Sequence, residues 1–302
     1  MHPLRAKFER ELRIRGRSER TIHAYVASIR ALTKHDQDRS PAKIGDEEIR
    51  DWLHHLRAAR RLSGSSLNVA VNAVRSFHAL VLGRAPAAAI AGVPRCQRAT
   101  TRAQVYAVAE MAALLAGAPA GRDRAFLSTV YACGLRLDEA RHLQTADLDV
   151  ARAQLRVRRG KGCKERVLPL PASLLARLRA YWRAERRHRP DYFPDEKNAW
   201  LFAGCRPGQP ISKGTAQNIY LRAVRASGIK RKKGLHTLRH SFATHLLEDR
   251  VEITAVQQLL GHTALGTTAR YLHVTVGRLD RIVSPLDLLG TVPPGAAAAA
   301  PA

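Results

Sequence analysis

Apolar residues recur every three or four positions through most of this chain, which is the spacing of helices that bury one face. Four such segments fill residues 3–85, and Gly16 interrupts the pattern between the first two. Candidate N-cap residues are Ser18 for the second segment, Asp46 for the third, and Ser65 or Ser66 for the fourth. The pattern predicts four short helices packed as a compact bundle.

The second half of the chain combines helical periodicity with one stretch of strand periodicity. Helices are expected over residues 109–117, 122–133, 173–188, 215–227 and, in two segments, 238–260. Gly261 is expected to cap the last of them. Residues 153–171 (AQLRVRRGKGCKERVLPLP) predict a β-hairpin, with Leu155 and Val157 on one face and Lys161 at the tip. The fold class is therefore mainly α with a small β-sheet: a four-helix domain followed by an α+β domain.

Composition indicates where these blocks are joined. Residues 84–105 are short of large side chains and contain Pro86 and Pro94, as a linker does. The predicted organisation is a helical domain at 1–85, a linker at 86–105, a second domain at 106–290 and a disordered Ala- and Pro-rich tail at 291–302. With 302 residues, 45% of them apolar, the chain can bury a core in each domain.

The charge of the chain points to a polyanionic partner. It carries 51 Lys and Arg against 25 Asp and Glu, a formal net charge of +26. Each phosphate that a cation neutralises releases condensed counterions, so a chain this basic favours nucleic acid. The alternative interpretation is an Arg-rich and Ala-rich composition that raises the count without a binding role.

Neither membrane insertion nor disulfide chemistry is expected. No run of about 18 apolar residues occurs, and residues 1–20 are charged throughout, so a transmembrane span and a signal peptide are excluded and a cytoplasmic protein is expected. Cys96, Cys133, Cys163 and Cys205 are far apart, which argues against a zinc knuckle and against a disulfide framework.

Basic and nucleophilic side chains gather at predicted helix ends late in the chain. The segment HTLRHSFATHLLE begins at His236 and contains Arg239 and His240, QQLLGH ends at His262, and Tyr271 follows nine residues later. At helix ends, side chains can converge on a bound group without being buried in the core. The arrangement is typical of a phosphoryl-transfer site.

Two further segments upstream carry charged side chains, and the chemistry of a phosphodiester explains why residue types of this kind belong together. The segment GLRLDE at residues 134–139 supplies Arg136 and Glu139, and the hairpin supplies Lys161. Guanidinium groups bind non-bridging phosphate oxygens in planar bidentate geometry and keep their proton. A tyrosine nucleophile, with a reference pKa near ~10, needs a base or a strongly positive site. A departing 5′-hydroxyl needs a general acid.

These segments resemble the tyrosine recombinase family, which includes phage integrases and Xer-type recombinases. The family pattern expects a G-L-R-x-x-E segment and a Gly-Lys-Gly hairpin upstream, and both occur here in that order, so the resemblance spans about Arg5 to Leu289. It implies a site-specific DNA recombinase or integrase, an enzyme that breaks and rejoins strands through a 3′-phosphotyrosine without a cofactor. It also implies that the first domain is a SAM-like core-binding domain that clamps DNA and that the second is catalytic.

The resemblance assigns roles to individual residues. The catalytic set is Arg136, Lys161, His236, Arg239, His262 and Tyr271. In this set Tyr271 is the nucleophile, His236 the candidate base and Lys161 the candidate general acid. Glu139 and His240 are expected to orient these catalytic side chains without acting on the phosphate themselves. Because Glu139 is the only carboxylate at a motif position, no metal is expected; the alternative is that His236 and His262 bind zinc.

Other basic residues are candidates for contact with the DNA backbone. They are Arg15, Arg17 and Arg20 in the first domain, Arg95 and Arg98 in the linker, and Lys230, Arg231, Lys232 and Lys233 before the HTLRH segment. For each of them a solvated charged surface is the alternative interpretation.

The expected partners are double-stranded DNA and further copies of the chain. The resemblance implies a homotetramer on two DNA sites, formed from a protein that is monomeric or weakly associated without DNA, and no membrane partner. The apolar residues of segment 276–290 either dock on a neighbouring protomer or fold back onto their own domain.

Two alternatives to a recombinase remain open from the sequence. A type IB topoisomerase-like enzyme uses the same side-chain chemistry to relax DNA, although the small four-helix first domain and the HTLRH form favour a recombinase. A non-catalytic DNA-binding protein of the same fold would have lost the tyrosine or an arginine, and both are present. Integration, transposition and resolution of mobile DNA are all compatible with the resemblance.

Overall fold

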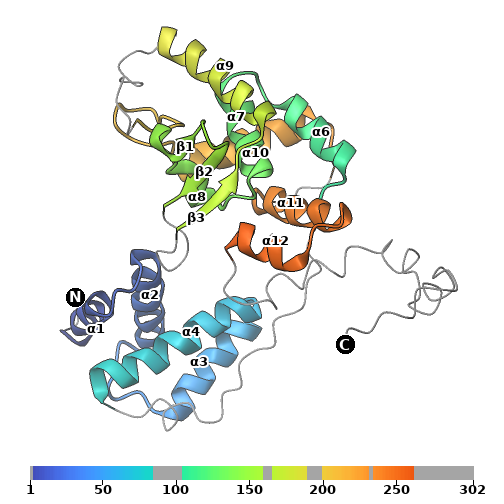
Figure 1. Cartoon of the computed structure of the whole chain (residues 1–302). Coiled ribbons are helices and arrows are strands. Elements are labelled where there is room, and N and C mark those ends of the chain that lie inside the picture. Colours follow the sequence, from blue (N-terminus) through green and yellow to red (C-terminus); the bar gives the residue numbers. More distant parts are fainter. Residues whose placement is uncertain (1–2, 84–103, 159–164, 189–198, 231–233, 262–302) are drawn as a thin grey trace, which may run out of the picture. The chain divides into compact units, whose positions relative to one another are not determined.

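The protein is mainly helical and forms two compact units. The computed structural model describes residues 3–83, 104–158, 165–188, 199–230 and 234–261. The units are Met1–Thr101 and Arg102–Ala302, and the second contains a small three-stranded sheet (Figure 1). The predicted fold class, mainly α with a small sheet, is confirmed. Among the described helices, none is both long enough and apolar enough to cross a membrane.

The first unit is the predicted bundle of helices, shown in blue and cyan in Figure 1. Its elements are α1 (Pro3–Ile14), α2 (Glu19–His35), α3 (Asp46–Ala58), α4 (Gly64–Phe77) and a short π-helix, η1 (His78–Leu82). The rings of Phe8 and Phe77 meet edge to face with centroids 5.3 Å apart, and Trp52 is almost fully buried in the same core. The apolar spacing read from the sequence is therefore the buried surface of this unit.

Two of the three predicted helix caps lie elsewhere. Ser18 caps α2 as expected, accepting a hydrogen bond from the Thr21 N–H at 3.3 Å. The prediction of Ser65 or Ser66 for α4 is wrong, because Ser63 is the N-cap residue. The prediction for α3 is wrong by one residue: Gly45 is the cap, and Asp46 is the first residue of the helix.

The second unit combines the sheet with helices. In chain order its elements are α6 (Val108–Gly117), α7 (Arg122–Ala132), α8 (Leu137–Arg141), η2 (Thr145–Asp147), β1 (Leu148–Asp149), β2 (Gln154–Val157), β3 (Arg166–Pro169), α9 (Ala172–His188), α10 (Lys213–Ala226), α11 (His236–Glu248) and α12 (Ile253–Leu260). The predicted hairpin is present as β2 and β3, which pair antiparallel, and Leu155 and Val157 are buried. The two-residue strand β1 was not predicted, since it is too short to show a period.

Helices α7 and α11 are buried on more than one side. Phe126 of α7 meets Phe202 edge to face, with ring centroids 5.2 Å apart, in the core of the unit. The buried residues of α11 include polar ones as well as Leu238, namely Thr237, Arg239, Ser241 and Thr244. Buried polar side chains need partners, so the interior position of α11 calls for specific contacts around it.

Candidate active site

A glycine turn brings the first predicted arginine against the helix that carries the second. Helix α7 ends at Ala132, and Gly134 follows with a φ of +54°. A Cβ atom at Gly134 would lie 2.3 Å from Cδ1 of Phe242 on α11, so this position requires glycine for space as well as for conformation. Arg239 of α11 donates from Nη1 to the Gly134 carbonyl at 2.6 Å. The turn thus fixes Arg136, two residues on, next to α11.

Two predicted site residues, Arg136 and Arg239, converge on the buried carboxylate of a third, Glu139. The side chain of Glu139 is only 2% exposed. It accepts from Nη1 of Arg136 at 2.7 Å and from the Arg136 backbone N–H at 2.8 Å, and Nη1 of Arg239 lies 3.8 Å away. Glu139 therefore brings the two predicted phosphate-binding arginines into one cluster, and its orienting role stays a prediction.

A third arginine, which the sequence did not single out, completes this cluster. Arg166, the first residue of β3, donates from Nη1 and Nη2 to the two oxygens of Glu139 at 2.9 and 2.7 Å. The alternation of side chains along the strand indicates that Arg166 points inward. Arg166 pairs with the buried Val157 and stands two residues before the buried Leu168, so a charged side chain shares the inner face of the strand.

The electrostatics of this cluster leave it positively charged. Burial by itself raises the pKa of Glu139, but the hydrogen bonds and charge of Arg166, followed by the contacts of Arg136, outweigh burial and hold that pKa at about 2. Three guanidinium groups around one carboxylate leave a surplus of two positive charges. The Arg136 side chain is 25% exposed, whereas that of Arg239 is 4% exposed, so Arg136 is the accessible edge of the cluster.

The last carbonyl groups of α12 are bound by the same arginines. Arg239 donates from Nη2 to the Leu260 carbonyl at 2.5 Å, and Arg166 donates from Nε to the Leu259 carbonyl at 2.9 Å. Gly261 caps α12 with a φ of +62°, as predicted. The main chain at residue 261 is therefore fixed to the arginine cluster directly before His262.

Two predicted histidines lie at the start of α11. His236 is the first residue of the helix, which begins two positions before the predicted start at residue 238, and its ring centroid lies 6.4 Å from that of His240. The pKa of His236 is lowered, first by partial desolvation and then by the charges of Arg239 and Arg136. A lowered pKa favours the neutral imidazole at neutral pH, the form that can accept a proton.

Many of the remaining predicted residues lie outside the described part of the chain. Lys161, His262 and Tyr271 fall outside the described residues, as do Arg95, Arg98, Arg231, Lys232 and Lys233. Arg15, Arg17, Arg20 and Lys230 are described and exposed. Within the described part of the chain, no three His, Cys, Asp or Glu side chains are grouped as metal ligands would be.

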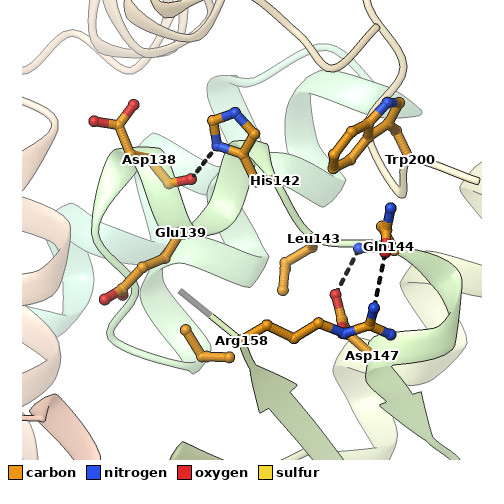
Figure 2. Close-up of a pocket in the computed structure, with 9 residues that line it drawn as sticks. Asp138, Glu139, His142, Leu143, Gln144, Asp147, Arg158 and Trp200 are labelled. Carbon is orange, nitrogen blue, oxygen red and sulfur yellow. Dashed lines mark hydrogen bonds and ion pairs between the residues drawn. The ribbon is translucent and has the colours of Figure 1, made fainter. Parts of the chain in front are cut away.

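A small pocket has Glu139 in its lining and so shares this residue with the cluster (Figure 2). His142 contacts the Asp138 carbonyl through Nδ1 at 2.7 Å on one wall, and Arg158 pairs with Asp147 on another. At ≈ 110 Å³ it is smaller than pockets that hold small-molecule ligands, which have about 300–1,000 Å³. It therefore gives no reason to place a cofactor beside the cluster.

Comparison with known proteins decides the family of this chain. Residues 103–278 match the phage integrase family, and residues 4–86 match the phage integrase N-terminal SAM-like domain. The chain belongs to the phage integrase family. It is a tyrosine recombinase, a site-specific integrase or recombinase that exchanges DNA strands, as the sequence motifs predicted.

Individual relatives extend over nearly all of this tyrosine recombinase. An integrase/recombinase of Escherichia coli is 35% identical over 304 residues, covering 90% of this chain and 89% of its own length. The tyrosine recombinase XerA of Thermococcus kodakarensis is 33% identical over 279 residues, covering 91% and 92%. The fold is shared with a lambda integrase tetramer bound to a Holliday junction, at a TM-score of 0.69 and 18% identity over 89% of this chain and 76% of that one.

Proposed function

We propose that this recombinase cleaves DNA by attack of the Tyr271 phenol oxygen on a backbone phosphodiester. The P–O5′ bond breaks, a 3′-phosphotyrosine forms, and the 5′-hydroxyl leaves. Attack by a 5′-hydroxyl from another strand reverses the step and rejoins the DNA. One phosphodiester-type bond replaces another at each step, so the cycle needs no ATP.

The observation that carries this proposal is the positive cluster around Glu139. A pentacoordinate phosphate accumulates negative charge on its non-bridging oxygens, and a preorganised cationic site stabilises that charge. The cluster has a surplus of two positive charges, and its accessible member is Arg136. Arg136 and Arg239 are thus assigned to the phosphate, and Glu139 is the carboxylate that both of them face.

Proton transfer is assigned to the residues at the edge of this cluster. His236 accepts the proton of Tyr271, since its lowered pKa keeps the imidazole neutral near pH 7. Lys161 donates a proton to the leaving 5′-oxygen, and His262 donates a hydrogen bond to the phosphate. His240 supports His236 from the next turn of α11, with ring centroids 6.4 Å apart.

DNA binding is assigned to both units, and assembly to four copies. The exposed Arg15, Arg17, Arg20 and Lys230 contact phosphates together with the linker and loop residues named above. Residues 86–105 form the linker between residues 1–85 and 106–290. Lambda integrase is described as a tetramer on a Holliday junction, and we extend that arrangement to four protomers of this chain on two DNA sites in the cytoplasm.

The test is covalent capture on DNA. The protein is incubated with labelled supercoiled and nicked plasmid, quenched in denaturant, and analysed for a protein–DNA adduct. Polynucleotide kinase should label the freed 5′-hydroxyl without prior phosphatase treatment, and polymerase should fail to extend the blocked 3′ end. An extendable 3′ end or a 5′-linked adduct would refute the proposal. Exchange between two linear duplexes, as opposed to relaxation alone, separates a recombinase from a topoisomerase-like activity.

A further inference from the structure

Arg166 connects three elements of the catalytic unit through a single side chain. It begins β3, donates to both oxygens of Glu139 on α8, and donates from Nε to the Leu259 carbonyl in the last turn of α12. Its side chain is 10% exposed, so it is not placed to bind DNA at the surface. The contacts join residues that are 27 and 93 positions apart in the chain.

The geometry around Glu139 decides how far Arg136 is free to bind another anion. Arg166 occupies both carboxylate oxygens in the planar bidentate arrangement, while Arg136 uses one nitrogen, Nη1, on one oxygen. A buried carboxylate requires full compensation of its charge. Without Arg166, the nearest replacements are Arg136 and Arg239, whose Nη1 is already 3.8 Å from the carboxylate. Each would be drawn away from a phosphate and toward Glu139.

The Arg166 side chain also restricts the position of the main chain at the end of α12. A Cβ atom at Gly261 would lie 3.2 Å from Cδ and 3.3 Å from Nη1 of Arg166, so Arg166 passes closely over this residue. Arg166 and Arg239 bind the carbonyls of the last two residues of α12, Leu259 and Leu260. The chain therefore leaves α12 toward His262 from a point that Arg166 helps to define.

We propose that Arg166 is a positioning residue of the recombinase: it neutralises Glu139 so that the partly exposed Arg136 can bind the scissile phosphate, and it fixes the end of α12. This inference rests on the cleavage chemistry proposed above. In this role Arg166 acts through Glu139 and α12, and no contact with DNA or the reacting atoms is assigned to it.

The first test separates DNA binding from cleavage. Arg166→Gln should bind DNA with nearly the affinity of the wild type in a gel shift, since the exposed cations remain, yet form the covalent adduct about 100-fold more slowly in a single turnover. Arg156→Gln is the matched control, because it removes one positive charge from an exposed position on the neighbouring strand β2. It should cleave at the wild-type rate.

The second test addresses the reason for the defect. If Arg166 acts by neutralising Glu139, removing the carboxylate charge should relieve its loss, and Glu139→Gln/Arg166→Gln should cleave at least about tenfold faster than Arg166→Gln. A role in general packing alone predicts no such recovery, because the double variant loses more contacts than the single one. Should Arg166→Gln not fold, as judged by circular dichroism, the same comparison is made between Arg166→Lys and Glu139→Gln/Arg166→Lys.

The outcomes distinguish this inference from the proposed function. Absence of any adduct from the wild type would refute the cleavage chemistry itself. A normal adduct from the wild type together with wild-type cleavage by folded Arg166→Gln would overturn only the role of Arg166. A slow single variant that the added Glu139→Gln change does not accelerate would also overturn it.

Discussion

Arg239 donates from Nη2 to the main-chain carbonyl of Leu260 at 2.5 Å. This hydrogen bond joins α11 to the C-terminal end of α12. The same guanidinium donates to the Gly134 carbonyl at 2.6 Å in the turn before Arg136. One arginine on α11 therefore holds two neighbouring segments while adding its charge to the site. Arginine suits this position because its fork presents several donors in fixed directions, which lysine does not.

Replacement of Tyr271 by phenylalanine tests the nucleophile. The variant should bind DNA as the wild type does but form no covalent adduct, because only the phenol oxygen is removed. The measurement is a gel shift run beside a denaturing gel of the same reactions. Tyr25→Phe, which removes a phenol oxygen in the first unit, serves as the control and should form the adduct normally. An adduct of normal yield with Tyr271→Phe would mean that another residue attacks.

Removal of divalent metal ions should leave cleavage intact. The site stabilises phosphate charge with arginine side chains, and two-metal nucleases depend instead on several convergent carboxylates. Adduct formation in excess EDTA should match that in Mg²⁺ at equal ionic strength, measured as an initial rate. Activity that returns only on addition of Mg²⁺ would contradict this expectation.

The ionisation of Glu139 should make stability depend on pH in the acidic range. Its pKa is lowered from 4.5 to about 2 in the folded protein, so the stabilisation is fully present above about pH 4.5 and is lost as the pH falls toward 2. The difference corresponds to about 3 kcal/mol in the free energy of unfolding. Denaturant titrations between pH 7 and pH 2 measure it.

A pair of variants isolates the contribution of Glu139. Glu139→Gln should be less stable at pH 7 and should show a flatter dependence on pH between 4.5 and 2, because the titrating carboxyl is gone. Glu165→Gln removes the same charge from an exposed position and should follow the wild-type curve. Parallel curves for the wild type and Glu139→Gln would refute the assignment.

Gly134 is expected to tolerate no side chain. Gly134→Ala combines a left-handed backbone with a contact of 2.3 Å to Phe242, so it should lower the free energy of unfolding by about 2 to 4 kcal/mol. Gly228 follows α10 with a φ of +71°, and no atom lies within 4 Å of an added Cβ. Gly228→Ala should therefore lower the free energy of unfolding only through its backbone conformation, by about 1 to 2 kcal/mol. Equal losses in the two variants would show that Phe242 yields without cost.

Truncation after Thr275 tests whether segment 276–290 docks on a neighbouring protomer or folds back onto its own domain. Binding to a single DNA site should persist, because the exposed cations of both units remain, but assembly of four protomers and recombination should be lost. Gel shift and analytical ultracentrifugation on paired sites measure the two properties separately. A truncated protein that still assembles and recombines would assign the link to another surface.

Local patterns in the sequence determined most of the secondary structure and the family. Periods of three to four and of two residues specified the helices and the hairpin, because each residue's burial depends on the direction of its side chain within its own element. Gly261 was predicted as a helix cap for an equally local reason. The errors at Asp46 and at Ser65 or Ser66 are of one to three residues: Gly45 has no polar side chain that would mark it as a cap, and Ser63 carries the same hydroxyl as Ser65 and Ser66.

The tertiary structure alone decided which charges meet. Glu139 and Arg166 are 27 residues apart, and Arg166 and Leu259 are 93 apart, so nothing in the local pattern of either segment specifies the contact. An arginine in phase with buried leucines indicates an inward side chain, but its partner depends on how β3, α8 and α12 pack. Because a buried charge is stable only beside its counter-charge, packing determined that Arg166 neutralises Glu139 and that Arg136 keeps an edge exposed.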